Sequence, residues 1–186
     1  MLSLESVLIG GYREWLKELN AQGRDLWLFT IQLKSIDRPA RAFLAIIERE
    51  LERIYRTLLT RITRRPKKTR LGELPILVGC PDSPVQKREA RGRPPSQVPN
   101  AAVHYHFVLA VPSRSRLREP LDQHVQRNID YYKGRIVLEI HVTPVTDVEG
   151  RLADYVLKQL KRKTYTADDI LILPQHNSEL PPRRSS

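Results

Sequence analysis

Cysteine is almost absent from this chain of 186 residues, which contains only Cys80. A single cysteine excludes a disulfide framework and a cysteine-based zinc site, and it fits a reducing, cytoplasmic setting. Long apolar runs are also missing: no stretch approaches the roughly twenty apolar residues of a membrane-spanning helix, so we expect no membrane partner. The first residues lack both a basic start and a cleavage site of small residues, so we expect no secretory signal.

Acidic residues are too few to balance the basic ones. The chain has 32 Lys and Arg residues against 21 Asp and Glu residues, which gives a formal net charge of +11. Such a charge implies an anionic partner, with nucleic acid ahead of an anionic membrane surface. A basic protein without any polyanionic partner is the alternative interpretation. At this length, one domain with a sizeable core is the simplest organisation.

Hydrophobic periodicity predicts both helices and strands. Apolar residues recur at steps of three and four from Phe43 to Ile62, as on one helix face, and Asp37 precedes them as a candidate N-cap. Residues 26–33 alternate in the manner of a half-buried strand. The expected order of elements is helix 5–20, strand 26–33, a helix from the Asp37 cap to Ile62, strand 74–78, strand 102–111, helix 117–132, strand 136–145 and a helix that ends near residue 163.

The expected strands have one apolar face, which in strand 136–145 includes Leu138, and three of them have a polar face. An antiparallel sheet with helices on one face and an open polar face on the other is an α+β sandwich. We expect it to occupy residues 25–174, after a helix in residues 1–24 and before a disordered tail in residues 175–186. Residues 81–99 contain five prolines and predict a mobile loop. The polar pairs are Thr30 with Gln32, His104 with His106, and Glu139 with His141.

A dense run of basic residues follows the expected long helix. Six of the ten residues from 61 to 70 are basic. A positively charged helix C-terminus is favourable through the helix dipole alone, but six charges exceed that need. The run therefore predicts contacts with the phosphate groups of a nucleic acid. Its members are Arg61, Arg64, Arg65, Lys67, Lys68 and Arg70.

Two histidines flank a single residue in the expected strand 102–111. Because side chains alternate along a strand, His104 and His106 face the same way and can share one ligand or one metal ion. Ordinary hydrogen bonding by two strand histidines is the alternative. His124 and His176 have no comparable neighbours in the sequence, and we expect both on the surface.

A tyrosine precedes a lysine by three residues in the last expected helix. Tyr155, Lys158 and Gln159 lie three and four positions apart, so they cluster on one side of that helix. Two imidazoles, a tyrosine hydroxyl and a cation suit an attack on a phosphodiester. Alternatively, Tyr155 belongs to the edge of an apolar stripe and Lys158 is a solvated cation. Tyr165 is a second candidate nucleophile, beyond the expected end of the helix.

Taken in order, these motifs resemble those of the HUH endonucleases, in particular the single-tyrosine rolling-circle replication initiators of plasmids and phages. The first motif is the strand 28–33 with its central threonine. The second is the histidine–hydrophobe–histidine segment 104–106. The third is the strand 134–142 followed by the tyrosine and lysine of segment 154–158. The resemblance spans residues 26–163.

The resemblance implies a ferredoxin-like sheet that binds a divalent metal and cuts single-stranded DNA at an origin or hairpin. By similarity, His104 and His106 hold Mg²⁺ or Mn²⁺, which polarises the scissile phosphate. Tyr155 is then the nucleophile that forms a 5′-phosphotyrosine link, and Lys158 neutralises charge on the phosphate. A replication initiator of this kind would also depend on a host helicase and polymerase.

The third metal ligand is the point at which the family pattern leaves alternatives. Gln159 resembles the arrangement in single-tyrosine transposases, whereas Glu139 or His141 could serve from the open face of the sheet. The chain is therefore similar to a replication-initiator nickase or to a transposase-like nuclease. A non-catalytic module that binds single-stranded nucleic acid is the remaining alternative, because basic residues and a few aromatic side chains suffice for binding.

Overall fold

A computed structural model describes residues 3–34, 40–82, 104–147, 152–162 and 165–175, without the side chains of residues 40–44. Asp37 and His176 lie outside the described residues, as does most of segment 81–99. The helices are α1 (Leu4–Ala21), α2 (Ala40–Ile62), α3 (Leu121–Arg127), α4 (Ile129–Tyr132), α5 (Leu152–Val156) and α6 (Lys158–Lys161). The strands are β1 (Asp25–Leu33), β2 (Ile76–Asp82), β3 (His104–Val111), β4 (Val137–Pro144) and β5 (Leu171–Leu173).

The five strands form one antiparallel sheet in the order β4-β1-β3-β2-β5. The expected α+β class and antiparallel sheet are therefore confirmed. The succession of β1, α2, β2, β3, α3 with α4, and β4 is the ferredoxin-like arrangement. β5 extends the sheet beyond β2, and its three residues were not expected from the sequence.

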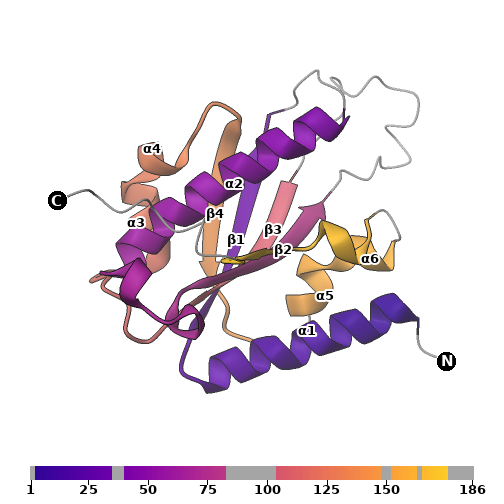
Figure 1. Ribbon diagram of the computed structural model, residues 1–186, viewed down its shortest axis with the longest axis horizontal. Coiled ribbons are helices and arrows are strands. Elements are labelled where there is room, and N and C mark those ends of the chain that lie inside the picture. Colours follow the sequence, from indigo (N-terminus) through magenta and orange to yellow (C-terminus); the bar gives the residue numbers. More distant parts are fainter. Residues whose placement is uncertain (1–2, 35–39, 83–103, 148–151, 163–164, 176–186) are drawn as a thin grey trace.

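The main core lies between the sheet and the helices α2, α3 and α4 (Figure 1). Alternate residues of β3, such as Phe107 and Leu109, face α2, as their spacing predicts. α2 presents Ile47, Leu51 and Leu58, all of which are fully buried. The helical spacing between Ile47 and Ile62 is thus confirmed as the buried face of α2.

The second face of the sheet is covered in part by helices, although it was expected to be open. α1 packs on α5 and α6, and all three lie on the side opposite α2 (Figure 1). Leu16 of α1, Val156 of α5 and Val108 of β3 belong to one buried cluster. The helices cover the apolar residues of this face. The polar residues of the same face lie outside the covered area, toward the start of β3.

Three element boundaries differ from expectation for local reasons. β2 continues through Pro81 and Asp82, because Asp82 still pairs with His104 on β3. The expected helix 117–132 is divided at Asn128, and the last helix is divided at Leu157, whose backbone has left helical geometry. In β4 a register shift inserts Leu138 as an extra residue, so that Val137 is buried and Leu138 is exposed.

Gly23 makes the turn that connects α1 to β1. Its φ of +79° is in the left-handed region, which glycine adopts without steric cost. The amide of Arg24 then donates to the carbonyl of Leu19, which closes the C-terminus of α1.

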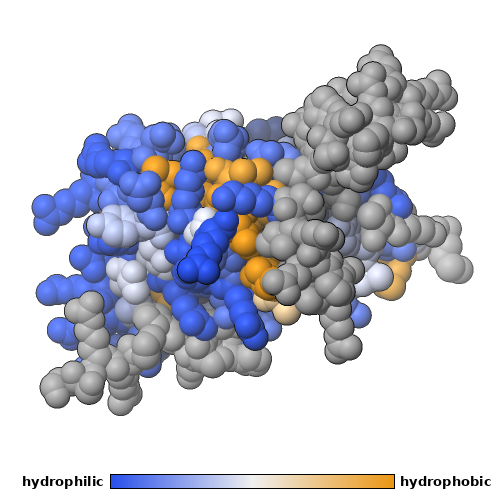
Figure 2. Space-filling model, turned by 90° about the horizontal axis from the view of Figure 1, so that it is seen from above, coloured by the Kyte–Doolittle hydropathy of each residue, from blue (hydrophilic) through white to orange (hydrophobic). Residues whose placement is uncertain are grey.

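The surface seen from above in Figure 2 is largely hydrophilic, and its main apolar area lies near the centre of the view. Within the described ranges, none of the helices is both long and apolar enough to cross a bilayer.

Gly79 is a test of the close contact between β2 and β3. A Cβ at this position would lie 2.8 Å from the Cα of Phe107 and closer still to the carbonyl oxygen of His106. We expect Gly79→Ala to lower the free energy of unfolding by about 1–3 kcal/mol, because backbone atoms of β3 must move. Urea denaturation followed by circular dichroism measures this change.

Gly11→Ala is the matched control. A Cβ on Gly11 in α1 meets no atom within 4 Å among the described residues. We expect this substitution to stabilise the protein by about 0.5–1 kcal/mol through helix propensity. Equal stability of the Gly79→Ala variant and the unmodified protein would contradict the packing described here.

Candidate active site

The register of the central strands places polar residues of β1 and β2 directly beside the two histidines of β3. On one side of β3, Thr30 pairs with His106 and Gln32 with His104. On the other side, Asp82 pairs with His104. Because directly paired residues of adjacent strands project from the same face, these five side chains share one surface of the sheet. The prediction that His104 and His106 face the same way is confirmed, and their ring centroids are 6.4 Å apart.

His106 is held on both ring nitrogens. Its Nε2 lies 3.0 Å from Oδ2 of Asp82, and its Nδ1 lies 3.0 Å from Oγ1 of Thr30. An ionised carboxylate can only accept, so Nε2 donates to Asp82 and Nδ1 accepts from the Thr30 hydroxyl. The residue is 6% exposed, and burial lowers the pKa of His106, as does the nearby charge of Lys158. The imidazole is therefore neutral at pH 7, the form in which histidine binds metals.

Asp82 connects the histidines to the tyrosine segment. Its Oδ2 lies 2.6 Å from Nζ of Lys158, and its Oδ1 accepts a hydrogen bond from Nε2 of Gln159. Burial by itself would raise the pKa of Asp82, but the hydrogen bonds from Lys158 and Gln159 outweigh burial and hold this pKa below its usual 3.8. A single carboxylate thus receives donors from β3 and from α6.

Tyr155 lies on the histidine face and not in the core. Its ring is 4.8 Å from the ring of His106, measured between centroids, and its side chain remains 43% exposed. Nζ of Lys158 lies 4.6 Å from the centroid of the Tyr155 ring. A phenol, an imidazole and an ammonium group are therefore brought together where solvent can reach the phenol.

The segment that carries Tyr155 is fixed from outside the sheet. Asp154 accepts from Arg13 of α1 at 2.5 Å and also from Lys161 of α6. Beneath these ion pairs, Val156 and Leu160 are buried against the sheet. Tyr155 faces the histidines from α5, and Gln159, which follows the break at Leu157, reaches Asp82 from α6.

The other residues suggested as metal ligands lie at different distances from the histidines. Gln159 is 2% exposed and adjoins Asp82. Glu139 and His141 are on β4, separated from β3 by the whole of β1. Their side chains pair with each other at 3.0 Å and are largely exposed. Gln159 therefore adjoins Asp82, which contacts His106, whereas Glu139 and His141 lie one strand further away, paired with Gln32 and Thr30 of β1.

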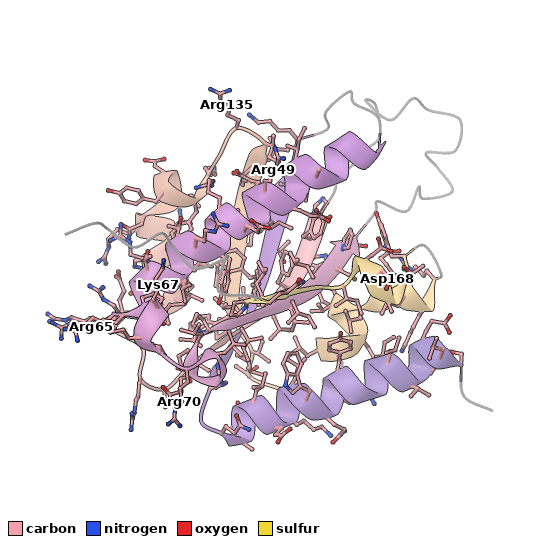
Figure 3. All side chains as sticks on the ribbon, in the orientation of Figure 1. Arg49, Arg65, Lys67, Arg70, Arg135 and Asp168 are labelled. Atoms are coloured by element: carbon pink, nitrogen blue, oxygen red, sulfur yellow. The ribbon has the colours of Figure 1, made fainter. Side chains whose placement is uncertain are left out.

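The predicted basic run is not part of this site. Arg61 lies in the last turn of α2, and its guanidinium carbon is 5.2 Å from the ring centroid of Tyr131. Arg65, Lys67 and Arg70 project at the end of the molecule where α2 ends (Figure 3). The histidine site and the basic run lie at opposite ends of β3. The strand begins at His104, and the residues that follow its other end line the same cavity as Arg64 and Arg65.

Sequence reasoning missed Asp82 and misplaced His124. Asp82 follows a proline and was assigned to an irregular loop, although the alternation of Val78, Cys80 and Asp82 could have extended the expected strand 74–78 by four residues. His124 was expected on the surface, but it is buried, and its Nε2 lies 3.0 Å from the hydroxyl oxygen of Tyr132. It is a structural histidine of the main core.

Two observations bear on metal binding at this site. Nε2 of His104 is buried and has no hydrogen-bond partner within the described residues, as expected of an imidazole nitrogen that a metal would take. His106 and Asp82 add a second imidazole and a carboxylate, which suit Mn²⁺ or Mg²⁺. In the part of the chain that the structure describes, no three His, Cys, Asp or Glu side chains already stand in a ligand arrangement.

Comparisons with family models, with curated proteins and with solved structures found no match. The geometry of the described residues therefore carries the functional argument.

Asp82→Asn tests the connection between the histidines and α6. The variant keeps the shape of the side chain but loses the charge that Lys158 and His106 face. We expect the free energy of unfolding to fall by about 2 kcal/mol at pH 7, the value of a hydrogen bond to a charged group. Chemical denaturation at several pH values measures it.

The pH dependence of the free energy of unfolding provides a control for the Asp82→Asn prediction. The pKa of Asp82 is lowered in the folded protein, so its stabilising effect is complete above 3.8 and declines as the pH falls through the lowered pKa. The difference between the unmodified protein and Asp82→Asn should therefore be constant from pH 7 to about pH 5 and shrink below pH 3.8. Asp25→Asn, at an exposed position of β1, should change the free energy of unfolding at pH 7 by less than about 0.5 kcal/mol.

Proposed function

We propose that this protein is a metal-dependent endonuclease that nicks and rejoins single-stranded DNA, with Tyr155 as its nucleophile. The observation that carries the proposal is the position of Tyr155: its half-exposed ring lies against His106, with Lys158 beside both. The resemblance of the same residues to the HUH motifs supports this assignment. The net charge of +11 supports a polyanionic substrate.

The proposed reaction transfers a phosphodiester from DNA to the protein. The phenolic oxygen of Tyr155 attacks the scissile phosphorus and loses its proton, while the bond from phosphorus to the 3′ oxygen breaks. The products are a phosphotyrosine linked to the 5′ end and a 3′ hydroxyl, which takes up a proton. The reverse reaction rejoins the strand, because the energy of the phosphodiester is kept in the covalent intermediate.

Lys158 has two roles in this proposal. Its ammonium group is close enough to the Tyr155 ring to stabilise negative charge on the phenolic oxygen and on the phosphate that approaches it. Its ion pair with Asp82 keeps the ammonium at this position before DNA binds. Burial of the surrounding residues reduces screening by water, so such a charge has more effect here than on an exposed helix.

His104 and His106 would hold the divalent metal, with Gln159 or Asp82, to which Gln159 donates, as the third ligand. A bound Mg²⁺ or Mn²⁺ would draw negative charge from the scissile phosphate as a Lewis acid. Binding through Nε2 of His106 would require its proton to move to Nδ1, which would then donate to Thr30, and the metal would replace the contact between Nε2 and Asp82. The sheet fixes the two histidines relative to each other.

The proposed setting is the cytoplasm of a cell that carries a plasmid, phage or transposon. A replication initiator would supply the 3′ hydroxyl to a host polymerase and need a host helicase. A transposase-like nuclease would use the same chemistry, and the buried Gln159 beside Asp82 favours this second candidate.

A covalent adduct is the decisive test of the nucleophile. The protein is incubated with labelled single-stranded DNA of random sequence and Mn²⁺, and the mixture is separated on a denaturing gel. We expect a metal-dependent adduct that Tyr155→Phe abolishes, because the phenolic oxygen forms the bond. Tyr131→Phe is the matched control: Tyr131 is similarly exposed but lies on α4, and this variant should form the adduct normally.

Lys158→Ala should form the same adduct about 100-fold more slowly, the usual effect of removing one charge-stabilising donor.

One outcome would contradict the nuclease proposal. If the unmodified protein binds DNA from its own genetic element but forms no adduct with it, the result would support the non-catalytic binding module instead.

Metal binding can be tested without cleavage. We expect saturating Mn²⁺ to raise the melting temperature by several degrees, since about 2.7 kcal/mol is gained when the ion is at a hundred times its dissociation constant. His104→Asn should lose this shift because it removes the buried Nε2. His141→Asn should keep it, and loss of the shift in this control instead would place the ion on β4.

A further inference from the structure

A charged cavity lies on the side of the sheet that α2 covers, whereas Tyr155 lies on the other side. It has a volume of about 660 Å³ and is formed by α2 and by the turn that leads from α4 into β4. We call it the α2–β4 cavity. Its charged lining consists of Arg49, Glu50, Arg53, Lys133 and Arg135.

One ion pair neutralises the carboxylate in this lining. Arg53 holds Glu50 through two bonds, with Nε 3.0 Å from Oε2 and Nη2 2.9 Å from Oε1. A Cβ on Gly134 would lie 2.6 Å from the carboxyl carbon of Glu50, so the glycine leaves room for the carboxylate. The guanidinium also donates to the carbonyl oxygens of Tyr131 and Tyr132. These bonds fix the wall formed by α2 to the turn before β4.

The other three cations of the lining carry charge that no carboxylate balances. Arg49, Lys133 and Arg135 are exposed and take part in none of the ion pairs formed within the described residues. In Figure 3, Arg49 and Arg135 lie toward the upper side of the view, away from Arg65 and Arg70 of the basic run. The surplus of positive charge attracts an anionic ligand to the cavity.

Apolar side chains lie among these charges. Ile46 and Ile136 line the cavity and are only partly buried. The upper side of Figure 3 faces the viewer in Figure 2, where hydrophilic side chains border the main apolar area. Protein interfaces combine an apolar centre with a polar rim in the same way. The cavity therefore suits a ligand that has both carboxylates and an apolar side chain.

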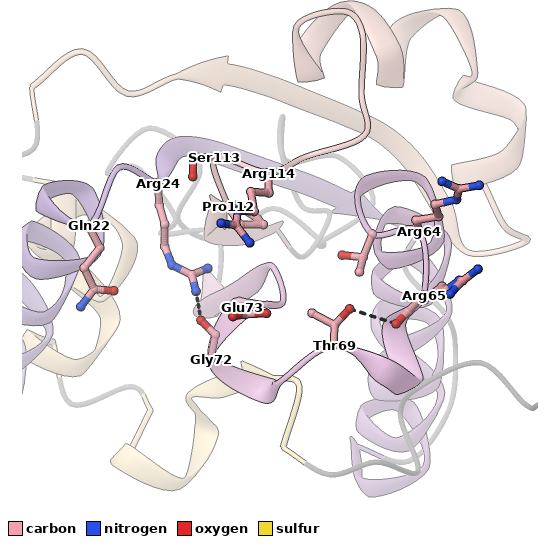
Figure 4. A pocket seen from close by; sticks show the side chains of 11 residues that line it. Gln22, Arg24, Arg64, Arg65, Thr69, Gly72, Glu73, Pro112, Ser113 and Arg114 are labelled. Carbon is pink, nitrogen blue, oxygen red and sulfur yellow. Dashed lines mark hydrogen bonds between the residues drawn. The ribbon is translucent and has the colours of Figure 1, made fainter.

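The cavity in Figure 4 has similar charges without this apolar surface. It lies where α1 and α2 end, has a volume of about 640 Å³, and is lined by Arg64, Arg65 and Arg114 among other residues. In Figure 4, Arg114 points toward the cavity, while Arg64 and Arg65 stand at its rim. Pro112 is its one apolar residue among the described residues. A comparison of the two cavities thus separates the effect of charge from that of apolar contact.

The surroundings of the α2–β4 cavity favour a peptide over other anions. β4 begins directly after Ile136 and is an edge strand, whose only strand partner within the described ranges is β1. An extended peptide can pair with the backbone of an edge strand, whereas a lipid or a nucleic acid cannot add a strand to the sheet. No aromatic side chain lines the cavity among the described residues, so bases would have no ring to stack on.

The charge of the chain indicates where such a peptide comes from. Segment 83–103, the longest one outside the described residues, has four basic residues and one acidic residue. Segment 176–186 has two basic residues and one acidic residue. A second copy of the chain would bring the same net charge of +11, and two such surfaces repel each other. We therefore expect the acidic ligand on a different protein.

We propose that the α2–β4 cavity binds an acidic peptide segment of a partner protein. An apolar side chain of the peptide contacts Ile46 and Ile136, and its carboxylates pair with the exposed cations of the lining. The inference goes beyond the proposed nuclease activity and does not depend on it. Because the cavity and Tyr155 lie on opposite sides of the sheet, a bound partner leaves the candidate active site accessible.

Fluorescence anisotropy of a labelled synthetic peptide tests the proposal. The peptide has eight residues, as β4 does: two leucines separated by one aspartate, and aspartate at every other position. Leucines two positions apart face the same way in an extended peptide, so both can contact the isoleucines. A second peptide has serine in place of both leucines. We expect the unmodified protein to bind the serine peptide about tenfold more weakly, because it lacks the apolar side chains.

Two variants test the lining, at about 0.15 M NaCl, where charges more than about 8 Å apart are largely screened. Arg49→Glu, Arg135→Glu should weaken binding of the leucine peptide about tenfold, because two attractive charge pairs become repulsive. Ile46→Ser should weaken binding of the leucine peptide about fivefold and leave binding of the serine peptide unchanged. Ile136 is not changed, because it also packs against the main core.

Arg65→Glu, Arg114→Glu is the matched control. It makes the same change of charge in the cavity of Figure 4 and should alter the affinity for the leucine peptide less than about twofold. An equal loss in this control would overturn the proposal, as would equal affinity for the two peptides. Absence of binding by the unmodified protein at about 1 mM leucine peptide would also overturn it.

A labelled strand of thymidines is titrated in parallel. If Arg49→Glu, Arg135→Glu weakens binding of this strand about tenfold but leaves peptide binding unchanged, the cavity is a nucleic-acid surface and the proposal is wrong. Tyr155→Phe should bind the leucine peptide as the unmodified protein does, because Tyr155 is not in the lining. Failure of the covalent adduct therefore leaves the peptide result standing, and the reverse also holds. Thermal unfolding checks that each variant is folded.

Discussion

The register between β3 and its two neighbours is the constraint on which the candidate site depends. It places Thr30 and Asp82 on either side of the histidines, so that one side chain from each neighbouring strand fixes His106. A shift by one residue would turn every side chain of a strand to the other face. The fully buried Phe107 and Leu109 oppose such a shift, because it would move them out of the core. The core therefore sets the alignment of the polar residues.

Much of the fold follows from patterns that depend on neighbouring residues in the sequence. The face of α2 and the alternation in β1 and β3 were predicted because burial of one face imposes a fixed period. The register shift at Leu138 and the three residues of β5 were not, since both depend on partners distant in the chain. The packing of α1 on the second face of the sheet is also a contact between segments that are distant in the chain. The partial apolar stripe of α1 indicates that one face of this helix is buried, but it does not indicate which element that face contacts.

The candidate site was predictable in its residue types but not in its connections. The histidine pair was found because it lies within one strand, and the tyrosine with its lysine because they lie only three residues apart, although on two consecutive short helices. Asp82 was missed because its importance comes from side chains that are distant in sequence, His106 on one strand and Lys158 on a later helix. A carboxylate that receives donors from separate elements has no local signature, and the proline before it favoured a loop interpretation.

The short helices that carry Tyr155 cannot be stable by themselves. α5 has five residues and α6 has four, well below the length at which an isolated helix persists in water. Their order comes from two sides: from α1, through the ion pair between Arg13 and Asp154, and from the sheet, through Asp82 and the buried contacts of Val156 and Leu160. Opening of α1 would therefore loosen the tyrosine segment on one side only, while Asp82 still holds α6 to the sheet. Amide hydrogen exchange in α5 would then respond to the opening of α1 more strongly than exchange in α6.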